Sequence, residues 1–166
     1  MDFAEAGVDC IEHATGLVPD TIDTFARQGI AIVPTLVNIG TFPDIAAGGE
    51  KKYPGYAAHM RDLHARRYDT ISAAHEAGVP IFCGTDAGGS LPHGLVAREV
   101  AELAKTSMTT EEAISAATWK AREWLGREGL TEGATADFVV YRDDPREDLR
   151  TMADPRNIVL RGAVVL

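Results

Sequence analysis

The sequence has few of the features that mark several classes of protein. Its 166 residues include only two cysteines, too few for a disulfide framework or a cysteine-rich metal site. No apolar run is long enough to span a bilayer, and the acidic start MDFAEAGVD lacks the order of a signal peptide. Only 16 basic residues stand against 25 acidic ones, and the net charge of -9 does not attract nucleic acid or anionic lipid. We expect a cytoplasmic protein that binds neither nucleic acid nor membrane.

Several catalytic motifs are also missing. The chain has no G-x-S-x-G nucleophile elbow, no phosphate-binding loop and no glycine-rich dinucleotide turn. Cys10 and Cys83 each lie three residues before a polar residue, His13 and Asp86, at which we expect a strand to end. Because side chains alternate along a strand, both thiols should face away from those polar groups. We therefore interpret the cysteines as packing residues and not as nucleophiles.

The first part of the chain alternates between strand and helix patterns. Strands are predicted at 8–13, 30–36 and 79–85, and helices at 3–7, 20–28, 56–77, 95–105, 110–117 and 119–125. The glycine-rich stretch 37–54 has no clear period and is predicted to be a long loop. Strands separated by helices pair in parallel. This indicates an α/β fold, either a barrel or an open doubly wound sheet.

The pattern changes after residue 126. A strand at 136–141 has no long helix after it, and the segments 157–160 and 163–166 form a hairpin pattern around Arg161-Gly162. We therefore predict two units, an α/β unit at 1–126 and a β-rich unit at 127–166.

Two polar residues stand at predicted strand ends. Asp86 closes the apolar stretch IFCGTDAGG, where an ionised carboxylate is costly unless a cation or hydrogen-bond donors meet it. It is either a metal ligand beside a reactive water or a cap for the amides of the following turn. His13, in CIEHATG, is either a metal ligand or hydrogen-bonded to a loop carbonyl. Parallel strands bring both residues to one edge of the sheet.

His93 lies on the loop just beyond Asp86, in SLPHG. It could orient a substrate or occupy an exposed turn. The three histidines of the predicted long helix, His59, His64 and His75, are not four residues apart, so they do not form a helical metal clamp. We interpret these three as solvated helix positions.

The ordered set of motifs resembles the amidohydrolase superfamily. It comprises VDCIEHATG, GIAIVPTL, AGVPIFCGTDAGG followed by PHG, EEAISAATWKAREWLG and GATADFVVY, and so covers essentially the whole chain. The closest branch contains imidazolonepropionase-like and Xaa-Pro-dipeptidase-like enzymes. The resemblance implies a metal-dependent hydrolase of C–N bonds in small amides, cyclic amides or dipeptides.

The resemblance also implies a fold and a site. The three strands at 8–13, 30–36 and 79–86 would be strands six to eight of a (β/α)8 barrel, and the β-rich unit would be part of a β-sandwich. His13 would bind a zinc or other divalent ion. Asp86 would bind the same ion and pass a proton from the water to the leaving amine. Gly88, Gly89 and His93 would face the substrate.

Most of the family's metal ligands have no counterpart in this sequence. The family's H-x-H motif on strand one, its strand-four lysine or glutamate and its strand-five histidine are all missing. Zinc sites use about three or four protein ligands, so we expect weak or no metal binding and no useful turnover by this chain alone.

Two further expectations concern assembly. Exposed strand edges favour a homo-oligomer or pairing with a missing N-terminal half. The alternative function is a non-catalytic interaction module that uses those edges. An open doubly wound binding domain becomes attractive only if the resemblance is accidental.

Overall fold

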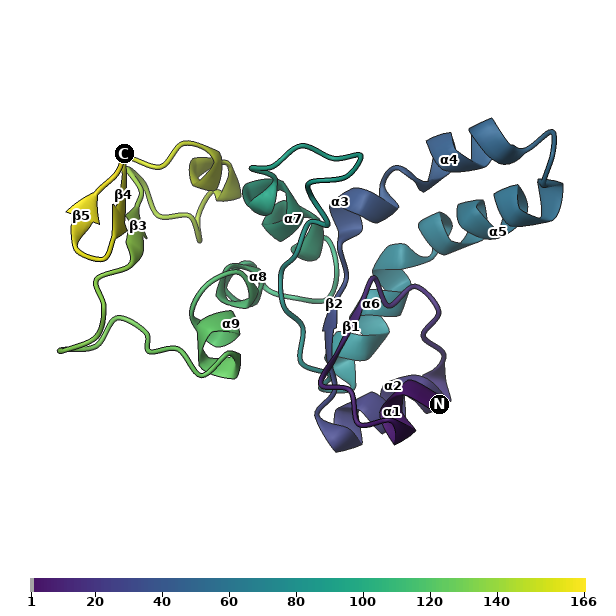
Figure 1. The fold of residues 1–166 in the computed structure, drawn as a ribbon, viewed down its shortest axis with the longest axis horizontal. Helices are drawn as coiled ribbons and strands as arrows, with labels where there is room; N and C mark the ends of the chain where they lie inside the picture. The colour runs from purple at the N-terminus through teal and green to yellow at the C-terminus, as the bar shows by residue number, and fades with distance from the viewer. Residues whose placement is uncertain (1) are drawn as a thin grey trace.

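Two short parallel strands lie at the centre of the computed structural model, which describes residues 2–166 (Figure 1). Strand β1 (Cys10–Glu12) pairs with β2 (Ala31–Val33), with Cys10 opposite Ala31. A third segment runs parallel to β2 through a bridge between Ile32 and Ile81. The spatial order is therefore β1, β2 and the segment around Ile81, and the molecule is a mixed α/β protein, as the sequence predicts.

The predicted strand at 79–85 is wrong in its length. Pairing with β2 is limited to two hydrogen bonds, from the Ile32 amide to the Pro80 carbonyl and from the Phe82 amide to the Ile32 carbonyl. The next amide, that of Cys83, donates instead to the carbonyl of Ala116 at the end of a later helix. The chain leaves the sheet at this point, so a regular strand does not form.

Helices surround this small sheet. The described helices are α1 (Asp2–Glu5), α2 (Pro19–Gln28), α3 (Leu36–Ile39), α4 (Phe42–Gly49), α5 (Pro54–Ala65), α6 (Arg67–Glu76), α7 (Val96–Leu103), α8 (Thr110–Ala116), α9 (Trp119–Trp124) and the 3-10 helix η1 (Leu149–Ala153). Local chemistry sets several ends, as predicted. Gly29 closes α2 in the left-handed conformation (φ 69°), and Thr109 and Glu112 form the capping box of α8. None of the described helices is long and apolar enough to cross a membrane.

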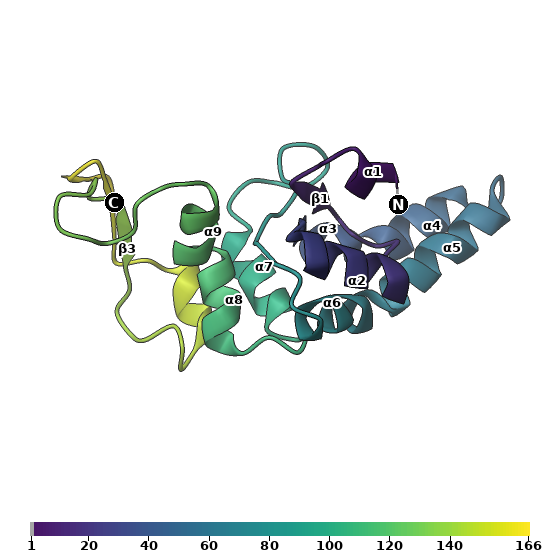
Figure 2. The ribbon, with the colours of Figure 1, turned by 90° about the horizontal axis from the view of Figure 1, so that it is seen from below.

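The predicted long loop at 37–54 is wrong, because α3 and α4 occupy most of it. Pro43 lies in the first turn of α4, where a proline fits a helix. The helix is stabilised by packing of Ala46 against α5, which extends together with α4 to one end of the molecule (Figures 1 and 2). The predicted helix at 56–77 is also two helices, because Arg66 (φ −93°, ψ 4°) interrupts it.

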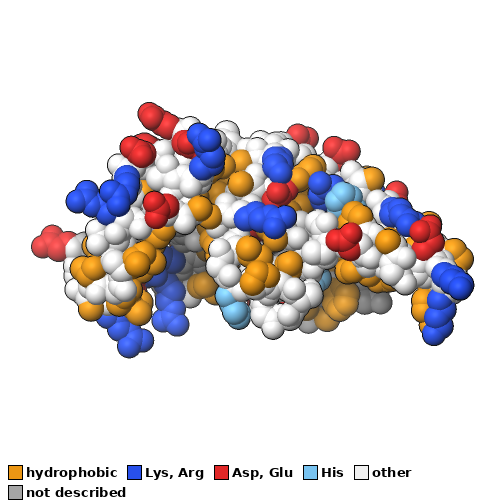
Figure 3. Space-filling model, turned by 90° about the horizontal axis from the view of Figure 1, so that it is seen from above, with side chains coloured by type: hydrophobic (Ala, Val, Ile, Leu, Met, Phe, Trp, Pro, Cys, Tyr) orange, Lys and Arg blue, Asp and Glu red, His pale blue; other side chains and the backbone are white. Residues whose placement is uncertain are grey.

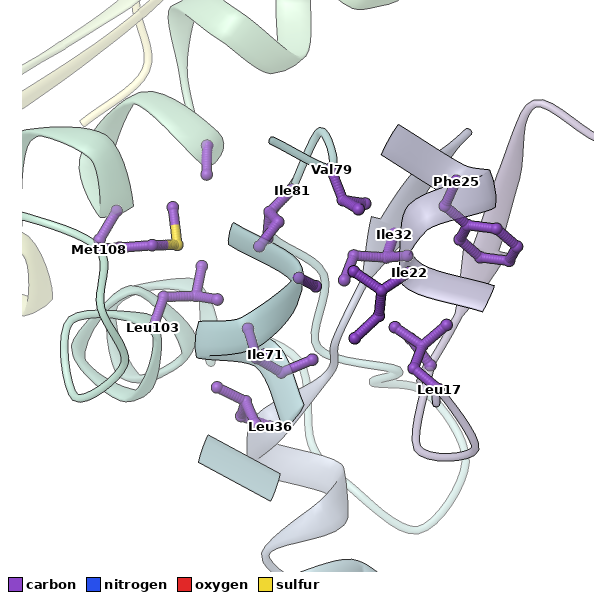
Figure 4. Close-up of a cluster of buried hydrophobic side chains, with 14 of the residues drawn as sticks. Leu17, Ile22, Phe25, Ile32, Leu36, Ile71, Val79, Ile81, Leu103 and Met108 are labelled. Carbon is purple, nitrogen blue, oxygen red and sulfur yellow. The ribbon is translucent and has the colours of Figure 1, made fainter. Parts of the chain in front are cut away.

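One hydrophobic cluster connects the sheet to its helices. Figure 4 shows side chains from α2, β2, α3, α6, α7 and the segment around Ile81 meeting in the interior. Its fully buried members include Ile32, Leu36, Ile71 and Leu103. Burial of each such side chain contributes roughly 1.5–3 kcal/mol. Packing in this cluster fixes the positions of β2 and the segment around Ile81, and so of the residues at their carboxyl ends.

A second sheet lies at the opposite end of the molecule from α4 and α5 (Figure 1). Its antiparallel strands are in the order β3 (Phe138–Val140), β4 (Asn157–Leu160) and β5 (Ala163–Val164). Arg161 (φ 52°) and Gly162 (φ 78°) turn the predicted hairpin, and positive φ at both positions is what a type I′ turn requires.

A substitution of Gly84 tests the close packing where the chain leaves the sheet. A Cβ at Gly84 would lie 2.5 Å from Cγ1 of Val33, whose branched side chain has little freedom to move. We expect Gly84→Ala to lower the free energy of unfolding by about 1–3 kcal/mol in urea denaturation. Gly16→Ala is the matched control, because a Cβ there meets nothing within 4 Å. Equal stability of the two variants would contradict this packing.

Candidate functional site

Polar residues follow the sheet at the carboxyl end of each parallel segment. His13 comes directly after β1, Thr35 follows β2, and Asp86 follows the segment around Ile81. The backbone amide of His13 also donates to the carbonyl of Val33 over 2.8 Å, so His13 is tied to the end of β2. The structure thus places both predicted site residues, His13 and Asp86, at the same edge of the sheet. In this fold class, ligands bind at that edge.

The backbone is strained at all three of these positions. His13 (φ 64°), Thr35 (φ 51°) and Asp86 (φ 52°) have left-handed conformations, although none is a glycine. Such a conformation is uncommon for a non-glycine residue and an outlier for a β-branched one such as Thr35. Each costs about 1–3 kcal/mol and persists only where the surroundings enforce it. Residues of this kind cluster at functional sites, which supports a role for this edge.

A short turn, Thr35–Asn38, contacts both predicted site residues. The Nδ1 atom of His13 lies 2.7 Å from Oγ1 of Thr35, which leaves Nε2 without a partner among the hydrogen bonds of the described residues. The Nδ2 atom of Asn38 donates to Oδ2 of Asp86 over 2.7 Å. We call this segment, which consists of Thr35 and the first three residues of α3, the 35–38 turn. It orients the imidazole from one end and the carboxylate from the other.

A buried carboxylate holds the middle of the 35–38 turn. Glu99 in α7 is 0% exposed, and its two oxygens accept hydrogen bonds from the amides of Leu36 (2.7 Å) and Val37 (2.8 Å). Burial raises the pKa of Glu99 to about 7, while the two amide hydrogen bonds act in the opposite direction. Helices α3 and α7 pack against each other here (Figure 1).

The sequence reasoning did not identify Thr35, Asn38 or Glu99. Thr35 and Asn38 fell at the end of a predicted strand and in a predicted loop, and residue type alone gave no reason to select them. Glu99 carried a usable signal. It precedes Leu103 by four residues and so shares the apolar face of its helix. A carboxylate on such a face requires a buried partner.

The glycine-rich loop after Asp86 brings His93 back beside it. Gly88 has φ 109°, and a Cβ there would lie 3.3 Å from Cε1 of His93. The His93 ring therefore packs on the bare backbone of Gly88, whose amide donates to the carbonyl of Leu91. Gly89 is exposed with open space around it. His93 is also exposed, at the surface of the loop that carries Asp86.

The cysteines do not supply a nucleophile. Burial raises the pKa of Cys83 to about 12, and that of Cys10 is also raised, mainly by burial. Cys83 packs against the main hydrophobic cluster. Because the thiolate is the reactive form, neither residue is suited to thiol chemistry.

The donor chemistry of His13 and Asp86 suits a divalent metal only in part. An imidazole with one nitrogen hydrogen-bonded and a carboxylate held by an amide are typical metal ligands with oriented partners. Within residues 2–166, however, no group of three His, Cys, Asp or Glu side chains could hold a metal ion. The two residues fit the ligand types but do not make up a full set.

Comparison with known proteins identifies the family. The profile of the Amidohydrolase family matches residues 1–163 of the chain. The chain belongs to this family. The resemblance inferred from the sequence motifs is therefore confirmed.

Individual relatives are longer than this chain. It is 53% identical over 158 residues to an uncharacterized protein of Mycobacterium tuberculosis, covering 95% of the chain and 42% of the relative. It is 28% identical over 163 residues to the ochratoxinase of Aspergillus niger, and the match covers 95% of this chain and 33% of that protein. The chain thus spans about two-fifths of the length of the first relative and a third of the second.

Solved structures agree with this result. A Xaa-Pro dipeptidase structure superimposes with a TM-score of 0.80 at 27% identity, covering 97% of this chain and 40% of that one. The structure of a putative prolidase from Bifidobacterium longum superimposes with a TM-score of 0.82 at 29% identity, covering 98% of this chain and 43% of that one. The fold is therefore that of part of these proteins.

The buried carboxyl group of Glu99 should make stability depend on pH. Its pKa of about 7 in the folded protein lies above the ordinary value of 4.5. The folded state therefore binds more protons between these values, and the free energy of unfolding falls as pH rises from about 4.5 to about 7. The fall should reach up to about 3 kcal/mol, since one pKa unit corresponds to about 1.4 kcal/mol. Urea denaturation across this pH range measures it.

The control for this measurement is a variant that lacks only the titrating group. Glu99→Gln should remove the fall, whereas Glu102→Gln, one turn along α7, should keep it. The other charged groups that influence the pKa of Glu99 are Arg98 and Glu102. Both are unchanged in Glu99→Gln. Parallel pH curves for wild type and Glu99→Gln would contradict the assignment.

Proposed function

We propose that this chain supplies part of the active site of a metal-dependent hydrolase that cleaves C–N bonds. The observation that carries the proposal is the arrangement of His13 and Asp86. Both follow parallel strand segments at one edge of the sheet, and both are hydrogen-bonded to the 35–38 turn. Family membership supports the reaction class. The name of one similar protein, an Xaa-Pro dipeptidase, favours a dipeptide as substrate, and small amides and cyclic amides are the other substrates of this proposal.

The proposed roles follow from the atoms that remain available. His13 would bind a zinc or other divalent ion through Nε2, because Nδ1 is engaged by Thr35. Asp86 would bind the same ion, and Asn38 would hold its Oδ2 atom in place. A divalent ion at this position would lower the pKa of a water molecule. Asp86 is exposed and could accept a proton from that water and return it to the leaving nitrogen.

The glycine-rich loop is proposed to contact the substrate. Gly88 and Gly89 would let a substrate approach the backbone closely, and His93 would lie at the side of the same loop. The barrel assignment is part of this proposal. β1, β2 and the segment around Ile81 would be strands six to eight of a (β/α)8 barrel within residues 1–126. Residues 127–166 would be a segment of a β-sandwich.

The remaining ligands are proposed to come from outside these 166 residues. The chain covers 33–43% of the relatives named above, so those proteins contain additional segments. A missing segment could pair with β1, whose outer edge has no strand partner among the described residues. Alternatively, two copies of this chain could cover that edge in a homo-oligomer.

Zinc binding tests the proposed ligands. We expect calorimetric titration of zinc into the chain to show weak binding, because a site normally needs about three or four protein ligands. Each of His13→Ala and Asp86→Asn should abolish that weak binding. Glu12→Gln is the matched control, since Glu12 is an exposed carboxylate next to His13 in sequence. Tight stoichiometric binding, or equal effects of all three variants, would refute the proposal.

Activity tests the completed site. The chain alone should not hydrolyse dipeptides or cyclic amides. Adding the segment of the Mycobacterium tuberculosis relative that this chain does not match should restore hydrolysis with zinc present. Asp86→Asn should remove the restored activity. A complex that forms without gaining metal or activity would favour the alternative below.

The alternative function is a non-catalytic interaction module. Apolar side chains on and beside β3, β4 and β5 are exposed, and hydrophobic surface gathers at this end of the molecule (Figure 3). The exposed residues are Phe138, Val139, Val140, Leu160, Val164, Val165 and Leu166. Such a surface suits burial against another polypeptide. A stable assembly that never binds metal would distinguish this function from the hydrolase.

A further inference from the structure

Glu99 is an unusual residue for its surroundings. Its carboxylate is completely buried beside Val100 and Leu103, and no ion pair among the described residues involves it. A buried carboxylate without a cation is costly unless hydrogen bonds replace its lost hydration. An apolar side chain at this position would leave the amides of Leu36 and Val37 without these acceptors. Its two hydrogen bonds indicate what it provides.

Both hydrogen bonds act on the 35–38 turn. The oxygens accept from the consecutive amides of Leu36 and Val37, at 2.7 and 2.8 Å. A two-oxygen contact to neighbouring amides fixes the direction of the backbone as well as its distance from α7. The bonded amides also come directly after Thr35, whose left-handed backbone requires support from its surroundings.

The fixed backbone carries the partners of both candidate ligands. Thr35 precedes the bonded amides and contacts the His13 ring, while Asn38 follows them and donates to Asp86. A shift of the turn toward or away from α7 would therefore move both contacts together. Glu99 itself forms none of its hydrogen bonds with His13 or Asp86.

We propose that Glu99 is a positioning residue. By binding the amides of Leu36 and Val37, it holds the 35–38 turn so that Thr35 and Asn38 orient His13 and Asp86 at one edge of the sheet. The role of that orientation in catalysis rests on the proposed hydrolase function. The structural coupling between Glu99 and the side chains of His13 and Asp86 is independent of that function.

Nuclear magnetic resonance of the metal-free chain tests the coupling. We compare wild type with Glu99→Gln, in which an NH2 group replaces one acceptor and faces a backbone N–H. One of the Leu36 and Val37 amide protons should shift upfield as its hydrogen bond is lost. At the two remote contacts, the ring nitrogen signals of His13 should change. The two side-chain NH2 protons of Asn38 should move closer together in shift as the bond to Asp86 weakens.

The matched control is Glu102→Gln on the same helix. Glu102 pairs with Tyr68 and Lys105 and forms no hydrogen bond with the 35–38 turn. This variant should leave the signals of His13 and Asn38 unchanged, whatever it does to stability. A folded Glu99→Gln variant with wild-type His13 and Asn38 signals would overturn the proposal. So would equal shifts in Glu102→Gln.

A second variant covers the case in which Glu99→Gln does not fold. Glu99→Asp keeps both acceptor oxygens on a side chain one methylene shorter, so it should draw the turn toward α7 and shift the same two sets of signals. Unchanged signals in folded Glu99→Asp would overturn the proposal. Because these measurements need neither metal nor substrate, failure of the zinc and hydrolysis experiments would leave their outcome intact.

Discussion

The hydrogen bonds from Leu36 and Val37 to the buried carboxylate of Glu99 connect the interior of this protein to its candidate site. On one side, α7 is anchored in the hydrophobic cluster by Val100 and Leu103. On the other, the 35–38 turn reaches the edge of the sheet. The position of the turn therefore depends on a polar contact that lies within an apolar core, where hydrogen bonds are strong and errors of geometry are costly.

The strained backbone at this edge is consistent with that arrangement. Three chain segments that end side by side each place a non-glycine residue in the left-handed region, at His13, Thr35 and Asp86. This conformation is uncommon for non-glycine residues and least favourable for the β-branched Thr35, so the surrounding packing must enforce it. The neighbouring glycines have a different task. Gly84 allows close approach to Val33, and Gly88 makes room for the His93 ring.

The sequence predicted the features that depend on local chemistry. The capping box at Thr109, the left-handed end at Gly29 and the Arg161-Gly162 hairpin each follow from a few neighbouring residues. Helices α3 and α4 depend on packing against α7 and α5, and the shortened pairing around Ile81 depends on the bond from the Cys83 amide to Ala116. The local patterns did not reveal these contacts. The same holds for the site. His13 and Asp86 stood out as polar residues at strand ends, whereas Asn38 and Glu99 act through partners 48 and 62–63 residues away.

The central claim is that His13 and Asp86 converge closely enough to bind one ion. Paramagnetic broadening by Mn²⁺ tests this most directly, because nuclei near the ion lose signal at low occupancy. The account predicts that signals from the His13 ring and the Asp86 amide broaden together, at the same manganese concentration and before those of Asp144 and Asp148, two carboxylates that form ion pairs with Arg146 and Arg150. Broadening of only one of the two, or of the Asp144–Asp148 region first, would contradict it.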